Sequence, residues 1–195
     1  MELILVRHGL PERVELAEGR ADPELSDIGH RQARQVAAWL SRKRVDAIYA
    51  SPLRRAMETA EPLAESIGLR PIIHESVAEF DRDASHYIPM EELKREDYSA
   101  WKAFVDGGYG EEVDMAEFAM RVCNGMEEII RANAGRRVVV FCHGGVVNVW
   151  TAKALGTAPS LFVDVDYGGI SRFLCASTGE RSVRSLNETG HLDLR

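Results

Sequence analysis

The sequence predicts an α/β fold, a three-layer α/β/α sandwich with a mainly parallel central sheet. Three observations carry this prediction. Residues 3–6 and 138–141 form short, continuous apolar runs, which are typical of strands buried on both faces. Amphipathic helical patterns lie between the expected strands, and both runs lead directly into a histidine followed by glycine. Because ligands of such sheets bind at the carboxyl ends of strands, both histidines point to that edge.

The first half of the chain alternates strands and helices. The run 3–6 predicts a buried strand that ends at Arg7-His8-Gly9. Residues 26–43 carry apolar side chains at helical spacing, with Ser26 or Asp27 available as the N-cap. Residues 47–49 predict a second short strand.

A second helix is expected to begin at Ser51-Pro52, because serine can cap a helix and proline is tolerated at its first position. Its apolar stripe extends to Ile67. Pro62 interrupts the pattern, so we expect a kink or a split there. Residues 72–73 predict a third, short strand.

The second half repeats this layout. Residues 114–117 resemble a capping box that opens a helix through Ile129, and Gly135 is expected to end it. The strongest strand signal, 137–142, leads into His143-Gly144-Gly145 and a helix over 146–155. Residues 170–176 and 181–186 predict a terminal hairpin.

Length and composition favour one domain over residues 1–195. The chain has 195 residues, of which 45% are hydrophobic, enough for one sizeable core. Residues 81–114 are rich in charged and aromatic side chains, and we expect a partly helical lid there. Within it, Arg82, His86 and Lys102 could recognise a second anionic group, although ordinary surface contacts explain each of them as well.

Charge and cysteine usage exclude several classes of partner. The formal charge of −7 predicts no general attraction to nucleic acid or to an anionic membrane, so any anion site must be local. The apolar start of the chain is too short for a signal peptide or a membrane span, which predicts a cytoplasmic protein. Three cysteines without CxxC spacing suit reduced core thiols. The oligomeric state stays open, with a homodimer among the alternatives.

The residues after the two long strands suit phosphate chemistry. A neutral imidazole such as that of His8 can act as a nucleophile, and the nearby arginines Arg7 and Arg55 could hold a phosphate dianion while opposing protonation of the ring. Backbone amides at a helix start bind anions, which favours the segment His143-Gly144 as a further contact. Each of these pieces alone also fits an ordinary loop or a solvated helix face.

In combination, four ordered motifs resemble the histidine phosphatase superfamily, also called the phosphoglycerate mutase-like family. The resemblance spans nearly the whole chain. The motifs are Arg7-His8-Gly9, Leu25-Ser26-Asp27-Ile28-Gly29, Ser51-Pro52-Leu53-Arg54-Arg55-Ala56 and His143-Gly144.

The resemblance implies a metal-independent phosphatase without cofactors that hydrolyses a small phosphate monoester. In this family the first histidine, here His8, becomes a phosphohistidine. The residues matched to its phosphate-binding groups are Arg7, Arg55, His143 and Gly144. A carboxylate serves as acid and then as base, and Glu79 is the candidate for it.

The sequence departs from the family pattern at two places. A Gly-x-Trp-Glu-Gly motif that follows the family's acid is missing, so Asp81 stays a second candidate for the acid beside Glu79. After Gly9, the segment 10–13 replaces residues that in the family often include an asparagine touching phosphate. The substrate specificity of family members therefore cannot be carried over to this chain. Glu12 and Arg13 face either the substrate or solvent.

Other classes of phosphatase fit the sequence less well. A cysteine-dependent phosphatase needs arginine six positions after its cysteine, but Asn148 follows Cys142 at that distance. A metallophosphatase could use His8, His143, Asp46 and Asp164, although no metal-ligand spacing supports the set. No P-loop motif is present. Mutase activity and non-catalytic sensing of a phosphorylated ligand remain alternatives to hydrolysis.

Overall fold

The fold is built on a six-stranded mixed sheet with the strand order β4-β3-β6-β1-β7-β8. The computed structural model describes residues 1–107 and 114–192. Four neighbouring strands are parallel, namely β4 (Ile72–Ile73), β3 (Ala47–Ala50), β6 (Arg137–Cys142) and β1 (Glu2–Arg7). The antiparallel hairpin of β7 (Ile170–Cys175) and β8 (Arg181–Glu188) extends the sheet beyond β1. The mainly parallel sheet is thereby confirmed.

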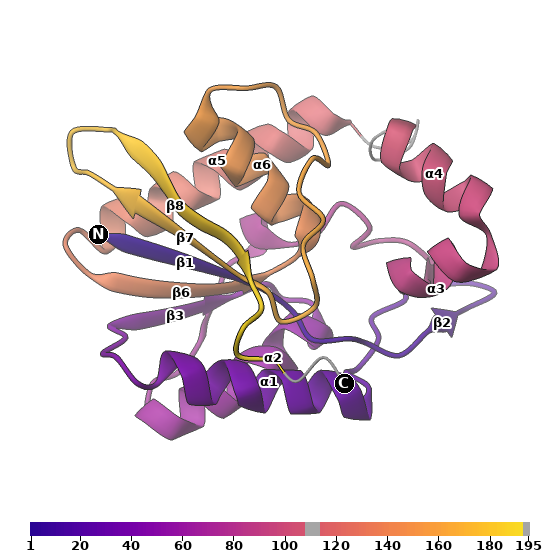
Figure 1. The fold of residues 1–195 in the computed structure, drawn as a ribbon, viewed down its shortest axis with the longest axis horizontal. Helices are drawn as coiled ribbons and strands as arrows, with labels where there is room; N and C mark the ends of the chain where they lie inside the picture. The colour runs from indigo at the N-terminus through magenta and orange to yellow at the C-terminus, as the bar shows by residue number, and fades with distance from the viewer. Residues whose placement is uncertain (108–113, 193–195) are drawn as a thin grey trace.

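Helices cover both faces of the sheet, which confirms the predicted sandwich (Figure 1). On one face lie α1 (Asp27–Leu40) and α2 (Arg54–Ile67), and on the other α5 (Met115–Ala132) and α6 (Gly144–Leu155). The continuous apolar runs contribute side chains to the core on both sides of the sheet, because successive strand residues point to opposite faces. In β1, Ile4 and Val6 pack toward α1 and α2, while Leu3 and Leu5 pack toward α5 and α6.

Two of the three predicted helix caps agree with the structure, and α6 begins at Gly144, two residues before the predicted start at 146. The Ser26 hydroxyl accepts a hydrogen bond from the Gly29 amide at the start of α1, and Asp114 caps α5 in the same way. The prediction for α2 was wrong: the helix begins at Arg54, its N-cap is Leu53, and Ser51 lies outside it. Helix α2 also continues through Pro62 to Ile67 without being split.

The end of α5 differs from the prediction as well. The helix ends at Ala132 with Asn133 as the C-cap, whose side chain donates hydrogen bonds to the Ile129 carbonyl and to the Tyr49 hydroxyl. Gly135 lies beyond it with a φ of +74°, in the turn that leads into β6. The side chain of Asn133 thus ends the helix before the glycine is reached.

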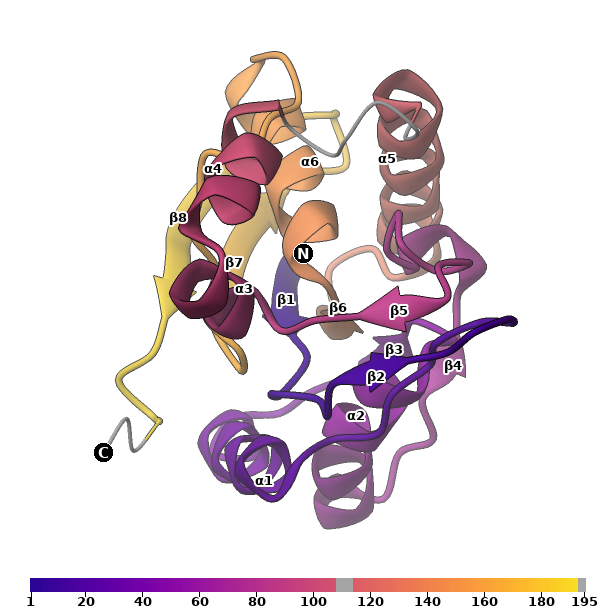
Figure 2. The ribbon, with the colours of Figure 1, turned by 90° about the vertical axis from the view of Figure 1, so that its right-hand side faces the viewer.

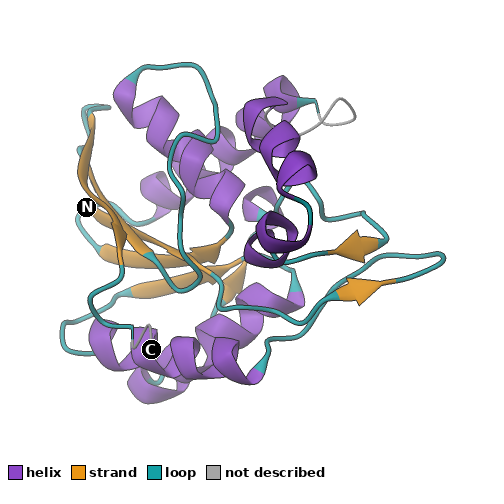
Figure 3. Ribbon diagram, turned by 45° about the vertical axis from the view of Figure 1, so that its right-hand side comes forward, coloured by secondary structure: helices purple, strands orange, loops and turns teal. Residues whose placement is uncertain are grey.

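The segment between β4 and α5 lies beyond the carboxyl ends of the parallel strands. It contains the 3-10 helix η1 (Glu75–Val77), β5 (His86–Tyr87), α3 (Met90–Glu96) and α4 (Tyr98–Gly107). Strand β5 pairs with β2 (Val14–Glu15) in a two-stranded ribbon (Figure 2). Figure 3 shows α3, α4 and this ribbon on the same side of the sheet. Residues 90–96 and 98–107 of this segment are helical, as the sequence predicts, and residues 108–113 of the expected lid lie outside the described residues.

None of the described helices is both long and apolar enough to cross a bilayer.

Candidate active site

The two strand-end histidines lie side by side. Strands β1 and β6 are adjacent and parallel, and their register pairs Arg7 with Cys142. The next residue on each strand is therefore His8 on one and His143 on the other. The His8 amide extends the ladder by donating to the Cys142 carbonyl at 3.0 Å. The two imidazole ring centroids are 5.1 Å apart, edge to face.

His8 is held as a neutral imidazole with one nitrogen directed at the site. Its Nδ1 lies 2.8 Å from the Gly9 carbonyl, which can only accept, so Nδ1 carries the proton. The lone pair is then on Nε2, which accepts a hydrogen bond from Nε of Arg55 at 3.3 Å. Burial, followed by the charges of Arg55 and Arg7, lowers the pKa of His8 well below its usual value. His8 has the protonation state that a nitrogen nucleophile requires.

Arg55 points into the site and Arg54 points away from it. The Arg55 side chain is 1% exposed, its guanidinium lies 4.6 Å above the ring centroid of Tyr87, and it donates to Asp81 at 2.9 Å. Arg54 is half exposed and pairs with Glu58 on the surface. Of the two adjacent arginines, Arg55 has the position required to contact a phosphate.

Arg7 is fixed by a tyrosine in a similar way. Its guanidinium lies 3.6 Å from the ring centroid of Tyr167 and donates to the Val165 carbonyl. The hydroxyl oxygens of Tyr167 and Tyr87 are 3.2 Å apart, so a hydrogen bond links the two rings on which the arginines stack. Both tyrosine rings also approach His8, with ring centroids 5.5 Å and 6.4 Å from that of the imidazole. The sequence analysis missed this pair because neither tyrosine belongs to a recognisable motif.

Ser51 has a role that differs from the predicted helix cap. Its hydroxyl oxygen lies 2.8 Å from Nε2 of His143 and also accepts a hydrogen bond from the Leu53 amide. A hydroxyl oxygen can accept two hydrogen bonds and donate one, so either Ser51 or the His143 ring can be the donor in this contact. Nδ1 is buried and makes no hydrogen bond to any residue that the structure describes. Burial and then the charge of Arg55 lower the pKa of His143.

Glu79 lies in the site at the start of α6. Its carboxylate accepts hydrogen bonds from the Gly145 amide at 2.8 Å and from the Phe80 amide at 3.2 Å. The residue is 6% exposed. Burial raises the pKa of Glu79 to about 7, and the neighbouring charge of Asp81 contributes to the rise. A carboxyl with such a pKa can exchange a proton near neutral pH.

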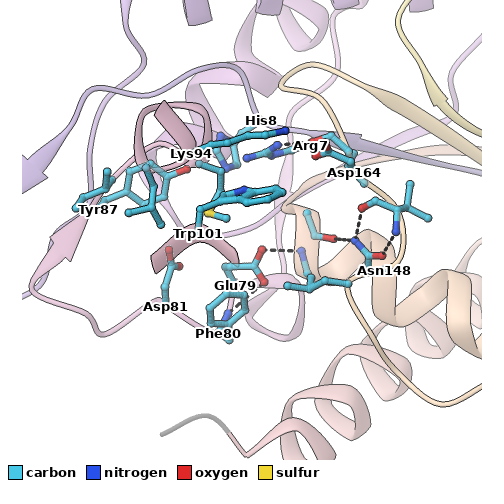
Figure 4. A pocket seen from close by; sticks show the side chains of 18 of the residues that line it. Arg7, His8, Glu79, Phe80, Asp81, Tyr87, Lys94, Trp101, Asn148 and Asp164 are labelled. Atoms are coloured by element: carbon cyan, nitrogen blue, oxygen red, sulfur yellow. Dashed lines mark hydrogen bonds between the residues drawn. The ribbon is translucent and has the colours of Figure 1, made fainter. Parts of the chain in front are cut away.

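These groups border a cavity of about 550 Å³. Figure 4 shows Arg7, His8, Glu79 and Asp81 within one site. His143 is not among the lining residues and is fully buried, with its ring next to that of His8. The other predicted site residues line the cavity together, and they are Arg7, His8, Arg55, Glu79 and Gly144.

Several other residues considered from the sequence lie elsewhere. Asp46 precedes β3, at the end of the sheet opposite His8, and accepts a hydrogen bond from the Arg137 amide. Arg82 pairs with Glu75, and neither it nor Lys102 lines the cavity. Across residues 1–107 and 114–192, no group of three or more His, Cys, Asp or Glu side chains is arranged to hold a metal ion.

The loop after Gly9 does not reach the cavity either. Arg13 forms ion pairs with Glu15 and with Glu96 of α3, and Glu12 is not a lining residue. Of Arg82, His86 and Lys102, the three candidates in the expected lid for contact with an anion, His86 alone borders the cavity. The segment that departs from the family pattern thus contacts α3 rather than the site.

Comparisons with known proteins agree with the geometry. The family model described as the histidine phosphatase superfamily (branch 1) matches residues 3–189. Phosphoserine phosphatase 1 of Hydrogenobacter thermophilus is 32% identical over 203 residues, covering 98% of this chain and 94% of that protein. A mutant phosphoserine phosphatase of Entamoeba histolytica, solved in complex with phosphoserine, superimposes with a TM-score of 0.76 at 25% identity and 98% coverage of each chain.

A second solved structure shows the same fold at lower identity. The mycobacterial glucosyl-3-phosphoglycerate phosphatase superimposes with a TM-score of 0.77 at 20% identity, covering 95% of this chain and 98% of the other. The fold is therefore shared across phosphatases whose substrates differ.

Proposed function

Since the chain belongs to the histidine phosphatase superfamily and is a phosphoric monoester hydrolase, we propose that His8 is the nucleophile that takes the phosphoryl group from its substrate. The observation that carries this assignment is the hydrogen bond from Nδ1 of His8 to the Gly9 carbonyl, which leaves the Nε2 lone pair toward Arg55. The substrate is a small phosphate monoester.

In the first step, Nε2 of His8 forms a bond to phosphorus while the bond between phosphorus and the ester oxygen breaks. The departing alkoxide needs a proton, and we assign its delivery to Glu79 rather than to Asp81. Glu79 has the raised pKa of about 7 that a general acid requires. Asp81 instead pairs with Arg55, whose guanidinium donates to one of its oxygens.

In the second step, water attacks the phosphohistidine. The Glu79 carboxylate, deprotonated by the first step, accepts a proton from the attacking water. The nitrogen–phosphorus bond breaks, inorganic phosphate leaves, and His8 returns to its neutral form. No external proton donor or cofactor is needed to close this cycle.

Arg7, Arg55 and His143 would stabilise the charge on the transferring phosphoryl oxygens, with Gly144 at the helix start beside them. The two guanidiniums are already fixed by Tyr167 and Tyr87, so little reorganisation is required. The ring centroid of His143 lies 5.1 Å from that of His8, which supports a place for His143 beside the transferring group.

The test is hydrolysis of p-nitrophenyl phosphate by the wild type and His8→Ala, with and without EDTA. We expect chelator-resistant turnover that is lost in the variant, and acid-labile labelling of the wild type alone. Full activity in His8→Ala would disprove the assignment. Transfer to a second phosphate acceptor without release of phosphate would instead indicate a mutase, and phosphate binding without turnover would indicate a sensor.

Other predictions from the sequence complete this proposal. We propose a single domain on which residues 81–114 act as a lid, acting in the cytoplasm without nucleic acid or membrane partners. The position of α3 and α4 beyond the carboxyl ends of the strands supports the lid. Size-exclusion chromatography with light scattering tests for a homodimer.

A further inference from the structure

The cavity has a charged floor and apolar walls. The floor is formed by the groups that act on phosphate, among them His8, Arg55 and Glu79. The walls come from two segments far apart in sequence. One is the region from β5 to α4, and the other is the loop between α6 and β7. Their apolar lining residues include Ile88, Leu93 and Trp101 on the first segment and Leu161, Phe162 and Val165 on the second.

The cavity is larger than a phosphoryl group requires. At about 30 Å³ for each water-sized atom, the five non-hydrogen atoms of phosphate would occupy roughly 150 Å³. The cavity measures about 550 Å³. Most of its volume is therefore left for the alcohol part of the ester, next to the apolar walls. A cavity of this size and lining is typical of sites that enclose a drug-sized ligand.

The walls offer few polar groups to that alcohol. Asn148 lines the cavity, but its amide nitrogen donates to the Gly144 and Val163 carbonyls and its oxygen accepts from the Val163 amide (Figure 4). Lys94 places its ammonium 4.5 Å from the ring centroid of Trp101 and is exposed, as is Asp164. The described polar side chains here are thus engaged or lie where water reaches them.

We propose that the physiological substrate is the phosphate monoester of an alcohol with an aromatic or bulky aliphatic body, which lies between Trp101 and Phe162. This inference rests on the proposed function, because it assumes that the phosphoryl group binds at His8. Amino and carboxylate groups, such as those of phosphoserine, would lose water against the apolar walls, and pairing with the exposed Asp164 and Lys94 would return little because water screens such pairs. Burial of an apolar body against the same walls instead stabilises the complex, because apolar area is removed from water.

The proposal is tested with three esters of primary alcohols, all of which need protonation of the leaving oxygen. They are 2-phenylethyl phosphate, glycerol 1-phosphate and phosphoserine. We expect kcat/KM for the phenylethyl ester to exceed that of either polar ester by at least about 10-fold, because a buried phenyl ring contributes more than the 1.4 kcal/mol that a factor of 10 represents.

Two wall variants test the position of the alcohol. Trp101→Ala and Phe162→Ala should each lower the preference for the phenylethyl ester by roughly 5- to 10-fold. Trp39→Ala is the matched control, because Trp39 stacks on His191 and does not line the cavity. Its preference should equal that of the wild type. Since the two wall residues lie on different segments, misfolding of one variant still leaves the other to decide.

The outcomes separate this inference from the proposed function. Equal kcat/KM for the three esters, or faster hydrolysis of phosphoserine, would overturn the substrate class while His8-dependent turnover stood. Wall variants that keep the full preference would also overturn it. Absence of both turnover and phosphohistidine with every ester would remove the proposed function and the substrate class with it.

Discussion

A carboxylate oxygen of Glu79 lies 2.8 Å from the backbone nitrogen of Gly145, the second residue of α6. The helix start thus anchors a carboxyl whose pKa is raised to about 7 by burial and by Asp81. A general acid must be protonated to act, so kcat/KM should fall as the pH rises above about 7. When the pH is low enough to protonate Glu79, His8 still stays neutral, because burial and the neighbouring arginines lower its pKa.

Glu79→Gln should lower kcat/KM for an alkyl phosphate by about 10²- to 10⁴-fold, the usual contribution of general acid catalysis. It should also remove the descending limb of the pH profile. With p-nitrophenyl phosphate the loss should be smaller, because nitrophenolate departs with little help from an acid. A descending limb that persists in Glu79→Gln would show that another group supplies the proton.

Asp81→Asn distinguishes the two carboxylates. Loss of the Asp81 charge should lower the pKa of Glu79, so the descending limb should move to lower pH. Asp83→Asn is the control, since Asp83 is exposed and does not line the cavity. If Asp81 were itself the acid, the limb would vanish instead of moving.

Ser51→Ala should weaken phosphate binding without unfolding the protein. The Ser51 hydroxyl is hydrogen-bonded to Nε2 of His143, and without this bond the ring can turn. A hydrogen bond of this kind contributes about 0.5–1.5 kcal/mol, which corresponds to a rise of roughly 2- to 10-fold in the inhibition constant of inorganic phosphate. Ser66→Ala, on the exposed side of α2, should leave that constant unchanged. Equal constants in both variants would exclude this role for Ser51.

Gly29→Ala should destabilise the fold. A Cβ at Gly29 would lie 2.1 Å from the Leu10 carbonyl oxygen, which Ser26 holds in place through its amide and its hydroxyl. Overpacking of this kind costs about 1–3 kcal/mol. For a protein of this size Tm falls by roughly 2–4 °C for each kcal/mol.

Thermal denaturation would measure the effect of Gly29→Ala. Gly190→Ala serves as its control, because an added Cβ there meets no atom within 4 Å. An unchanged Tm in Gly29→Ala would show that the loop after His8 can move away from α1.

The sequence could predict the parts of the site that lie on regular elements. The apolar runs at β1 and β6 are continuous because both faces of each strand are buried, and this pattern located His8 and His143 at one edge. The motif around Arg54 and Arg55 favoured the second arginine, and the helical position of Arg55 buries it beside His8.

Contacts across the chain could not be predicted in this way. Tyr87 and Tyr167 are 80 positions apart, and only the pairing of β5 with β2 and the path of the loop before β7 bring their hydroxyls together. Ser51 was misjudged because a Ser-Pro pair is typical of a helix start, whereas here the hydroxyl serves the distant His143. Tertiary hydrogen bonds of this kind leave no periodic signal in the sequence.

The in-register pairing of β1 with β6 also limits which insertions the sequence of such a protein can accept. A one-residue insertion in either strand would turn every following side chain to the opposite face, and one of the two histidines would leave the site. The chemistry is thus fixed by a backbone ladder that tolerates substitution but not a change of length. The wall from α3 and α4 belongs to no strand of the central sheet, so this segment can lengthen, shorten or exchange side chains and thereby alter the accepted alcohol while His8 and His143 stay in place.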